Sequence, residues 1–200
     1  FIGTVLAVTG SCGKTSVKEM LSAILSVQTQ VLSTSGNLNN GYGVPVTLFR
    51  LTKEHDNAVI ELGTSSPGEI QYIAELAKPD IAIITNAAEA HLEELKSVKG
   101  VAKEKGYILD ALGEKGVAVL NRDDVFFSEW RERTLAVSGR QVLSFSLENG
   151  DADCSAQNIN LSDEGMTFDL YVRGESRPVH LSFWGRHQVA NACCAAVAGI

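Results

Sequence analysis

The chain has 200 residues, of which 44% are hydrophobic and 20% are charged, and its formal net charge at pH 7 is −7. This length and composition are typical of one globular domain with a substantial core. The negative charge argues against nucleic acid as the main partner, because no basic stripe is available to meet a phosphate backbone. No apolar run approaches the roughly 20 residues that a membrane helix needs, and no signal peptide is visible.

A glycine-rich loop near the start of the chain is its most informative segment. An apolar run at 4–8 predicts a buried strand, and residues 16–25 predict a helix with one apolar face, formed by Val17, Met20, Leu21, Ile24 and Leu25. Between these two elements lies the sequence Thr9-Gly10-Ser11-Cys12-Gly13-Lys14-Thr15. Strand, glycine loop, Lys-Thr and helix form the layout of a phosphate-binding loop, here in the short form G-x-x-G-K-T.

The residue types of this loop suit an anionic ligand. Its glycines let backbone N–H groups converge on the anion, and the helix N-terminus adds partial positive charge. Lys14 can reach the outer phosphates of a nucleotide, and the Thr15 hydroxyl can hold Mg²⁺. The alternative is a glycine-rich turn with only a structural role.

Apolar strands and helices alternate along the next hundred residues, which predicts an α/β fold. Strands are expected at 31–34, 58–62, 80–86 and 116–121, and helices at 44–51, 67–77 and 97–112. This order implies a mostly parallel sheet with helices on both faces. Between 141 and 184 short alternating strands separated by polar turns predict antiparallel pairs that flank the main sheet, and residues 186–200 return to helix.

Polar residues at the predicted strand ends are candidates for a site, because ligands of open α/β sheets bind there. Glu61 lies within an apolar strand, where an acid is costly unless it is paired or holds a metal. It is a candidate Mg²⁺ ligand beside Thr15, with a buried salt bridge as the alternative. Asn86 ends another strand, and His91 follows five residues later as either a metal ligand or an ordinary loop histidine.

Lys105 lies on the apolar stripe of the helix predicted at 97–112, whereas Lys99 and Lys103 do not. A lysine that faces a core is expected to be neutralised, paired or modified, because burial disfavours the ammonium form. The alternative is a side chain that reaches solvent from the edge of the stripe.

The four cysteines show no C-x-x-C pair and no metal-binding spacing, so we expect reduced thiols in a cytoplasmic protein. The chain begins without Met and stops within an Ala-rich helical stretch. We therefore expect residues 1–200 to be one domain of a longer protein.

Six segments in this order resemble the central ATP-binding domain of the Mur ligases, and among these the MurF type. They are T-G-S-C-G-K-T, G-N-L-N-N-G-Y-G-V-P, V-I-E-L-G-T-S-S-P-G-E-I, N-A-A-E-A-H-L-E, G-V-A-K-E-K-G and G-R-H-Q-V-A-N-A. Together they span about residues 3–198. The second and third segments favour the MurF type over its relatives.

The resemblance implies an ATP-dependent ligase of bacterial cell-wall synthesis, cytoplasmic and acting as a monomer. The carboxylate of UDP-N-acetylmuramoyl-tripeptide would attack the γ-phosphate of ATP to form an acyl phosphate, and the amine of D-alanyl-D-alanine would then displace phosphate. The family's N-terminal UDP-binding domain and its C-terminal domain are not expected within these 200 residues.

The resemblance also assigns roles to individual residues. Lys14 and the loop residues Gly10, Ser11, Cys12, Gly13 and Thr15 would hold the phosphates. Thr15 and Glu61 would ligate one Mg²⁺, and His91 with a carbamylated Lys105 would serve a second. Asn191 would contact the adenine side of ATP with His187 nearby, and Asn39 and Asn40 would lie close to nucleotide and substrate.

Some positions depart from the family pattern. Ser66 stands where MurF-type sequences often carry histidine, Gln188 replaces a frequent asparagine and Gly41 a frequent acid. Two other readings remain. One is a ligase similar to folylpolyglutamate synthase, and the other is a regulatory module in which nucleotide binding changes shape without forming a bond.

Overall fold

A single nine-stranded sheet organises the computed structural model, which describes residues 1–200. Its strand order is β2-β3-β1-β4-β5-β6-β7-β8-β9. The strands are β1 (Thr4–Thr9), β2 (Val31–Ser33), β3 (Asn57–Glu61), β4 (Ile81–Ile84), β5 (Val117–Asn121), β6 (Gln141–Ser146), β7 (Cys154–Ser162), β8 (Gly165–Val172) and β9 (Glu175–Leu181). Strands β1 to β6 pair in parallel, and β7, β8 and β9 pair antiparallel. The predicted α/β class with a flanking antiparallel segment is confirmed.

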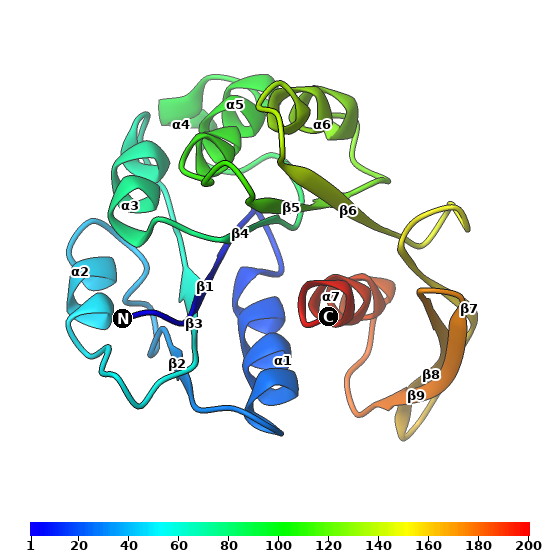
Figure 1. The fold of residues 1–200 in the computed structure, drawn as a ribbon. Coiled ribbons are helices and arrows are strands. Elements are labelled where there is room, and N and C mark those ends of the chain that lie inside the picture. Colours follow the sequence, from blue (N-terminus) through cyan, green and yellow to red (C-terminus); the bar gives the residue numbers. More distant parts are fainter.

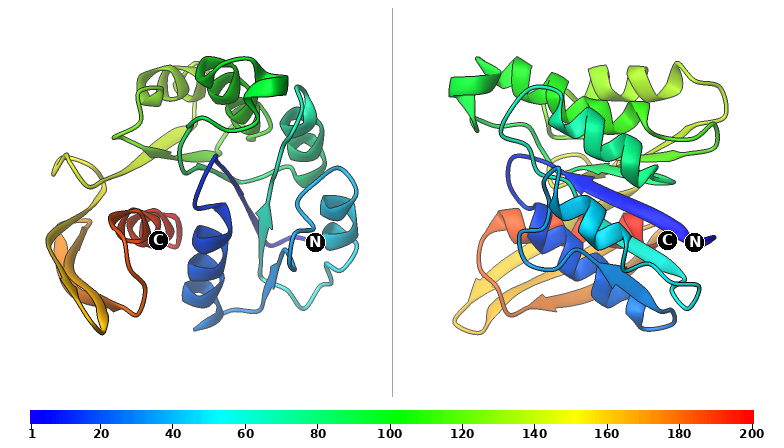
Figure 2. Two further views of the ribbon diagram at one scale, coloured as in Figure 1. Left: turned by 180° about the vertical axis from the view of Figure 1, so that it is seen from behind. Right: turned by 90° about the vertical axis from the view of Figure 1, so that its left-hand side faces the viewer.

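Seven helices connect or cover the strands. They are α1 (Lys14–Ser26), α2 (Gly43–Leu48), α3 (Glu69–Ala77), α4 (Leu92–Leu95), α5 (Val98–Asp110), α6 (Phe127–Leu135) and α7 (Arg186–Ala198). The right-hand view of Figure 2 shows β1 between two helical layers. None of the helices combines the length and hydrophobicity that crossing a bilayer requires.

Alternate side chains of the central strands supply two separate cores, as the two-residue period of a strand dictates. Val5 and Ala7 of β1 belong to a cluster with residues of α2, α3, α5 and α6. Leu6 and Val8 belong to a second cluster with α1, α7, β7 and β8. The sheet therefore curls around α1 and α7, and β7 to β9 close the far side of this layer (Figure 1). Ile24, expected on the apolar face of α1, is instead 42% exposed.

Strand β6 corrects one sequence prediction, because it pairs in parallel with β5 and does not belong to an antiparallel hairpin. A parallel pair needs a crossover connection, and the unpredicted helix α6 supplies it. This helix is mostly polar, and only Trp130 and Thr134 are buried. Strand β7 touches β6 through two residue pairs at its beginning before it turns into the antiparallel segment.

Glu104 joins two of the helices that cover the first core. Its side chain is 3% exposed, and its two carboxylate oxygens accept hydrogen bonds from Gly68 N and Ile70 N, both at 2.9 Å. These amides lie at the start of α3, where backbone donors have no partner within the helix. Glu104 of α5 therefore caps α3 from a neighbouring helix.

We predict that Glu104→Ala lowers the free energy of unfolding by about 2 kcal/mol, because it leaves two amides without their acceptor. Glu104→Gln keeps one acceptor oxygen and is expected to lose about half as much. Denaturant unfolding of both variants measures this. The exposed neighbour Lys103→Ala serves as control and should change stability by less than about 0.5 kcal/mol. Equal losses for Lys103→Ala and Glu104→Ala would contradict the capping role.

Candidate active site

The glycine-rich loop lies between the end of β1 and the start of α1 and packs against the end of β4. Ser11 N donates to Asn86 O and Cys12 N donates to Asn86 Oδ1, both at 3.0 Å. Gly13 has a φ of 85° and is the N-cap of α1, and the first bond of the helix runs from Val17 N to Gly13 O at 2.9 Å. The amides of residues 13–16 precede that bond, so they are available to an anion.

Both loop glycines are needed for close packing. A Cβ atom at Gly10 would lie 1.8 Å from Thr85 Oγ1, and one at Gly13 would lie 2.4 Å from Asn191 Oδ1. The loop is therefore pressed between the end of β4 and helix α7. Asn191 was predicted to face the nucleotide, and the structure brings it to the loop.

Lys14 bridges the loop in this structure. Its Nζ donates to Gly10 O at 2.7 Å and to Ser11 O at 3.4 Å. Burial lowers the pKa of Lys14 below its ordinary value, while the nearby Glu61 carboxylate acts in the opposite direction. The ammonium is thus held at the loop by carbonyl groups, which a phosphate would outcompete because it adds the attraction of an opposite charge to the hydrogen bond.

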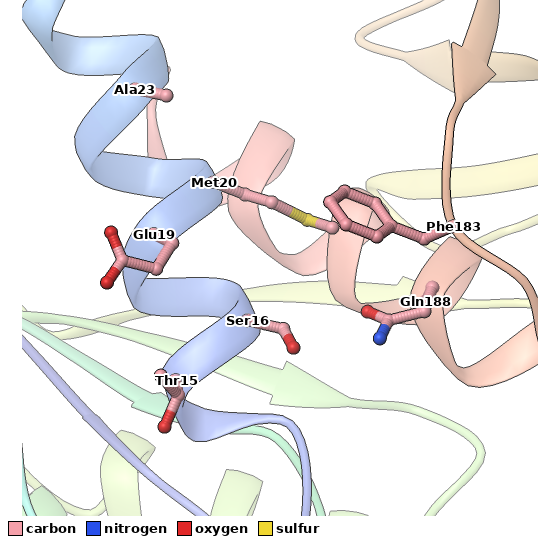
Figure 3. Close-up of a pocket in the computed structure, with 7 residues that line it drawn as sticks. All are labelled: Thr15, Ser16, Glu19, Met20, Ala23, Phe183 and Gln188. Atoms are coloured by element: carbon pink, nitrogen blue, oxygen red, sulfur yellow. The ribbon is translucent and has the colours of Figure 1, made fainter. Parts of the chain in front are cut away.

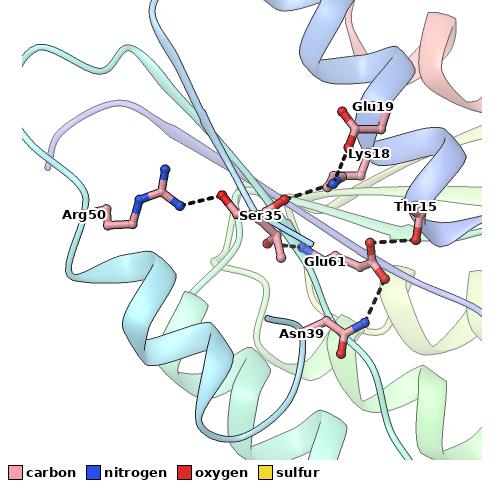
Figure 4. A network of polar contacts seen from close by, with 8 residues as sticks. Thr15, Lys18, Glu19, Ser35, Asn39, Arg50 and Glu61 are labelled. Atoms are coloured by element: carbon pink, nitrogen blue, oxygen red, sulfur yellow. Dashed lines mark hydrogen bonds and ion pairs between the residues drawn. The ribbon is translucent and has the colours of Figure 1, made fainter. Parts of the chain in front are cut away.

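Glu61 forms the polar centre of the site. Its side chain is 2% exposed, and it ends β3 directly beside Val8 of β1 in the parallel register. Thr15 Oγ1 donates to Glu61 Oε2 at 3.0 Å, and Asn39 Nδ2 donates to Glu61 Oε1 at 2.9 Å (Figure 4). Glu61 makes no ion pair with a neighbouring side chain. A buried carboxylate that meets only neutral donors favours a cation, and carboxylate, hydroxyl and amide oxygens suit Mg²⁺.

Lys105 is buried, which decides between the two alternatives that the periodicity of its helix left open. Its side chain is 2% exposed, whereas Lys99 and Lys103 are exposed. Burial, reinforced by the positive charge of Lys14, lowers the pKa of the Lys105 ammonium to about 8, and Glu104 opposes this shift. Lys14 of the phosphate loop is thus close enough to Lys105 to affect its pKa. Because Lys105 is buried, the alternative of an edge lysine that reaches solvent is wrong.

His91 is exposed and precedes α4 with a φ of 52°. Burial alone would raise the pKa of Glu69, but hydrogen bonds from Ser65 N and Ser66 N and the proximity of His91 lower it. No group of three or more His, Cys, Asp or Glu side chains in the structure could hold a metal ion. A second metal site built from Glu61, His91 and Lys105 stays a prediction.

A cavity of about 640 Å³ opens beside the phosphate loop, between the ends of β4, β5 and β6 and the first turn of α7. Three predicted nucleotide-binding groups line it, namely the loop, His187 and Asn191. Among the other lining residues, Asn86 was noted as a polar residue at a strand end, but Thr85, Asn121 and Phe145 were not predicted from the sequence. The lining residues are Cys12, Gly13, Ser16, Thr85, Asn86, Asn121, Phe145, His187, Gln188, Ala190 and Asn191.

A second pocket of about 410 Å³ lies along the first turns of α1. Met20, Ala23 and Phe183 give it apolar walls, and Figure 3 shows the Met20 side chain directed toward the Phe183 ring. It shares Ser16 and Gln188 with the larger cavity. The two spaces therefore adjoin at the first turn of α1, beside the glycine-rich loop.

The two adjacent asparagines of the predicted site have different surroundings. Asn39 contacts Glu61, as described above. Asn40 Oδ1 accepts bonds from Tyr42 N at 3.1 Å and Gly43 N at 2.9 Å, so its side chain holds the turn that leads into α2. Asn40 does not line the cavity beside the phosphate loop. A contact of Asn40 with substrate stays a prediction.

All four cysteines are free thiols in the structure. Cys12 in the phosphate loop is exposed, while Cys154, Cys193 and Cys194 are buried between β7 and α7.

Comparison with known proteins supports this geometry independently. Residues 8–199 match the family model described as Mur ligase middle domain. A UDP-N-acetylmuramoyl-tripeptide–D-alanyl-D-alanine ligase of Escherichia coli K12 is 46% identical over 192 residues, which is 96% of this chain and 42% of that protein.

Solved structures agree with the sequence match. MurF from Acinetobacter baumannii superimposes with a TM-score of 0.91 at 40% identity, over 98% of this chain and 42% of that one. MurF from Thermotoga maritima, in complex with ADP, gives a TM-score of 0.85 at 30% identity, over 98% of this chain and 45% of that one. The chain thus spans about two fifths of the length of these relatives. On its motifs, its fold and this match, it belongs to the Mur ligase family, as a middle domain of the MurF type.

Proposed function

We propose that this chain is the ATP-binding part of a ligase that joins D-alanyl-D-alanine to UDP-N-acetylmuramoyl-tripeptide in the bacterial cytoplasm. The observation that carries the proposal is the buried Glu61 carboxylate, held by Thr15 and Asn39 beside a phosphate-binding loop. The names of the relatives support the choice of substrates. We also propose that the protein acts as a monomer.

In the proposed reaction, a carboxylate oxygen of the tripeptide attacks the γ-phosphorus of ATP, and ADP leaves. The amine of D-alanyl-D-alanine then attacks the acyl carbon of the acyl phosphate, loses a proton, and inorganic phosphate leaves. Lys14 and the amides of residues 13–16 would bind the phosphate chain. The nucleoside would enter the cavity lined by His187 and Asn191.

Thr15 and Glu61 would hold Mg²⁺ at the end of β3. Bound there, the ion would offset negative charge that gathers on the phosphoryl group. Asn39 keeps the Glu61 carboxylate turned toward Thr15, so the ligands are oriented before the nucleotide arrives.

Lys105 would act as a carbamate at a second metal position with His91. Its lowered pKa supports this role, because only the neutral amine adds CO₂. The Lys105 nitrogen would form a bond to the carbon of CO₂ and lose a proton, which gives an oxygen anion suited to Mg²⁺.

We predict that the full-length protein releases phosphate from ATP only when both UDP-N-acetylmuramoyl-tripeptide and D-alanyl-D-alanine are present. A coupled phosphate assay with these substrates, and with folate and glutamate in parallel, measures this. Turnover that depends on folate would replace the proposal with a synthase-like activity. Nucleotide binding without turnover on either substrate set would identify a regulatory module.

Lys14→Ala is expected to weaken ATP–Mg²⁺ binding about 10- to 100-fold, which corresponds to the ~1.5–3 kcal/mol of a hydrogen bond to a charged group. The domain should remain folded, since the Lys14 ammonium donates hydrogen bonds only to carbonyl groups of its own loop. Calorimetric titration and a thermal melt test both statements. Unchanged affinity would refute the phosphate-loop assignment, and a collapsed melt would identify a structural lysine.

Lys105→Ala in the full-length protein should abolish most ligase activity, and added acetate should restore part of it. A small carboxylate can occupy the position that the carbamate leaves empty. The matched control is Lys103→Ala on the exposed side of the same helix, which should retain activity with no response to acetate. Full activity of Lys105→Ala, or acetate activation of the control, would contradict the carbamate role.

A further inference from the structure

Besides Lys105, the protein buries Lys18 of helix α1, and neither the proposed chemistry nor the apolar periodicity of the helix explains this burial. The Lys18 side chain is 2% exposed, although Lys18 lies only three residues after Thr15. Its Nζ donates to Thr34 O at 2.9 Å and pairs with the exposed Glu19 carboxylate at 2.6 Å. A buried ammonium is costly, and an ion pair with an exposed partner offsets little of that cost. Its contact with Thr34 is therefore the feature that needs an explanation.

Thr34 connects this ammonium to the candidate cation site. It follows the end of β2, is 1% exposed, and its backbone N–H donates to Val59 O at 3.1 Å. Its side-chain Oγ1 accepts a hydrogen bond from Glu61 N at 2.9 Å. One residue therefore contacts Lys18 through its carbonyl group and Glu61 through its hydroxyl group.

The chain that leaves Thr34 returns to the same glutamate. Five residues later Asn39 Nδ2 bonds the Glu61 carboxylate at 2.9 Å, and Asn39 O accepts Gly63 N at 2.7 Å. Segment 34–39 is therefore attached to the end of β3 at both of its ends. In Figure 4, Lys18 and Thr15 both project from α1 toward this arrangement, Lys18 to the backbone beside Ser35 and Thr15 to the Glu61 carboxylate.

We propose that Lys18 is a positioning residue for the cation site. It fixes Thr34, and through segment 34–39 it holds the Glu61 carboxylate in the orientation that faces Thr15. This inference rests on the proposed use of Glu61 as a Mg²⁺ ligand. Lys18 does not touch nucleotide or metal, and it acts only through Thr34 and Asn39.

The test separates metal-dependent from metal-independent binding in the full-length protein. ADP affinity is measured by calorimetry in EDTA and over a series of Mg²⁺ concentrations. Lys18→Met removes the ammonium but keeps the apolar stem, and Thr34→Val removes the hydroxyl but keeps the shape. Thr34→Ser keeps the hydroxyl, and Lys115→Met makes the same chemical change at an exposed position.

We expect Lys18→Met and Thr34→Val to reduce the affinity for Mg²⁺ about tenfold, in the range usual for residues that orient metal ligands. Their ADP affinity in EDTA should stay within about twofold of the unmodified protein. Thr34→Ser and Lys115→Met should match the unmodified protein in both conditions. Thermal melts accompany each titration.

Two results would overturn the inference. One is an unchanged Mg²⁺ dependence with a lower melting temperature, which would make Lys18 merely structural. The other is an equal loss of ADP affinity with and without Mg²⁺, which would place its effect on the phosphate loop. If Lys18→Met does not fold, Thr34→Val and Thr34→Ser decide the question. An unmodified protein whose ADP binding ignores Mg²⁺ would instead refute the proposed ligand role of Glu61.

Discussion

The buried negative charge of Glu61 is the constraint on which the rest of the site depends. The parallel register of β1 and β3 sets Glu61 beside Val8, one residue before the phosphate loop departs. An acid at this depth requires hydrogen-bond donors, and they come from Thr15 of α1 and from Asn39 in the segment after β2, while the Glu61 backbone N–H donates to the Thr34 hydroxyl of the same segment. Three separate stretches of chain are thereby fixed relative to one another around a single carboxylate.

Helix α5 shows how two adjacent buried charges can have different functions. Both carboxylate oxygens of Glu104 accept hydrogen bonds from amides at the start of α3, so its role is structural. Lys105 has no hydrogen-bond partner among the protein's own groups and lies under the electrostatic influence of Lys14. The capping contact of Glu104 also ties α5, which carries Lys105, to the start of α3.

Much of this arrangement could be predicted from sequence because it depends on local patterns. The glycine loop, the strand ending at Glu61 and the buried face that contains Lys105 all follow from spacing within one element. Lys18 and Glu104 could not be found in this way, because their partners lie in other elements and each residue looks like an ordinary charge on a helix surface. Helix α6 was not predicted because its core contact depends mainly on Trp130. Without that helix there was no crossover connection, so the parallel pairing of β6 with β5 was not predicted either.

The distribution of thiols allows the phosphate loop to be labelled selectively. Cys12 is the exposed cysteine, and the other three are sealed between β7 and α7. A thiol-directed fluorophore would therefore label this chain at the Cys12 sulfur alone, next to the backbone amides proposed to bind phosphate, with no need to remove the other cysteines first. Binding of a nucleotide at the loop would then change the fluorescence of the label. A nucleotide bound before labelling would slow the reaction of Cys12 with the reagent.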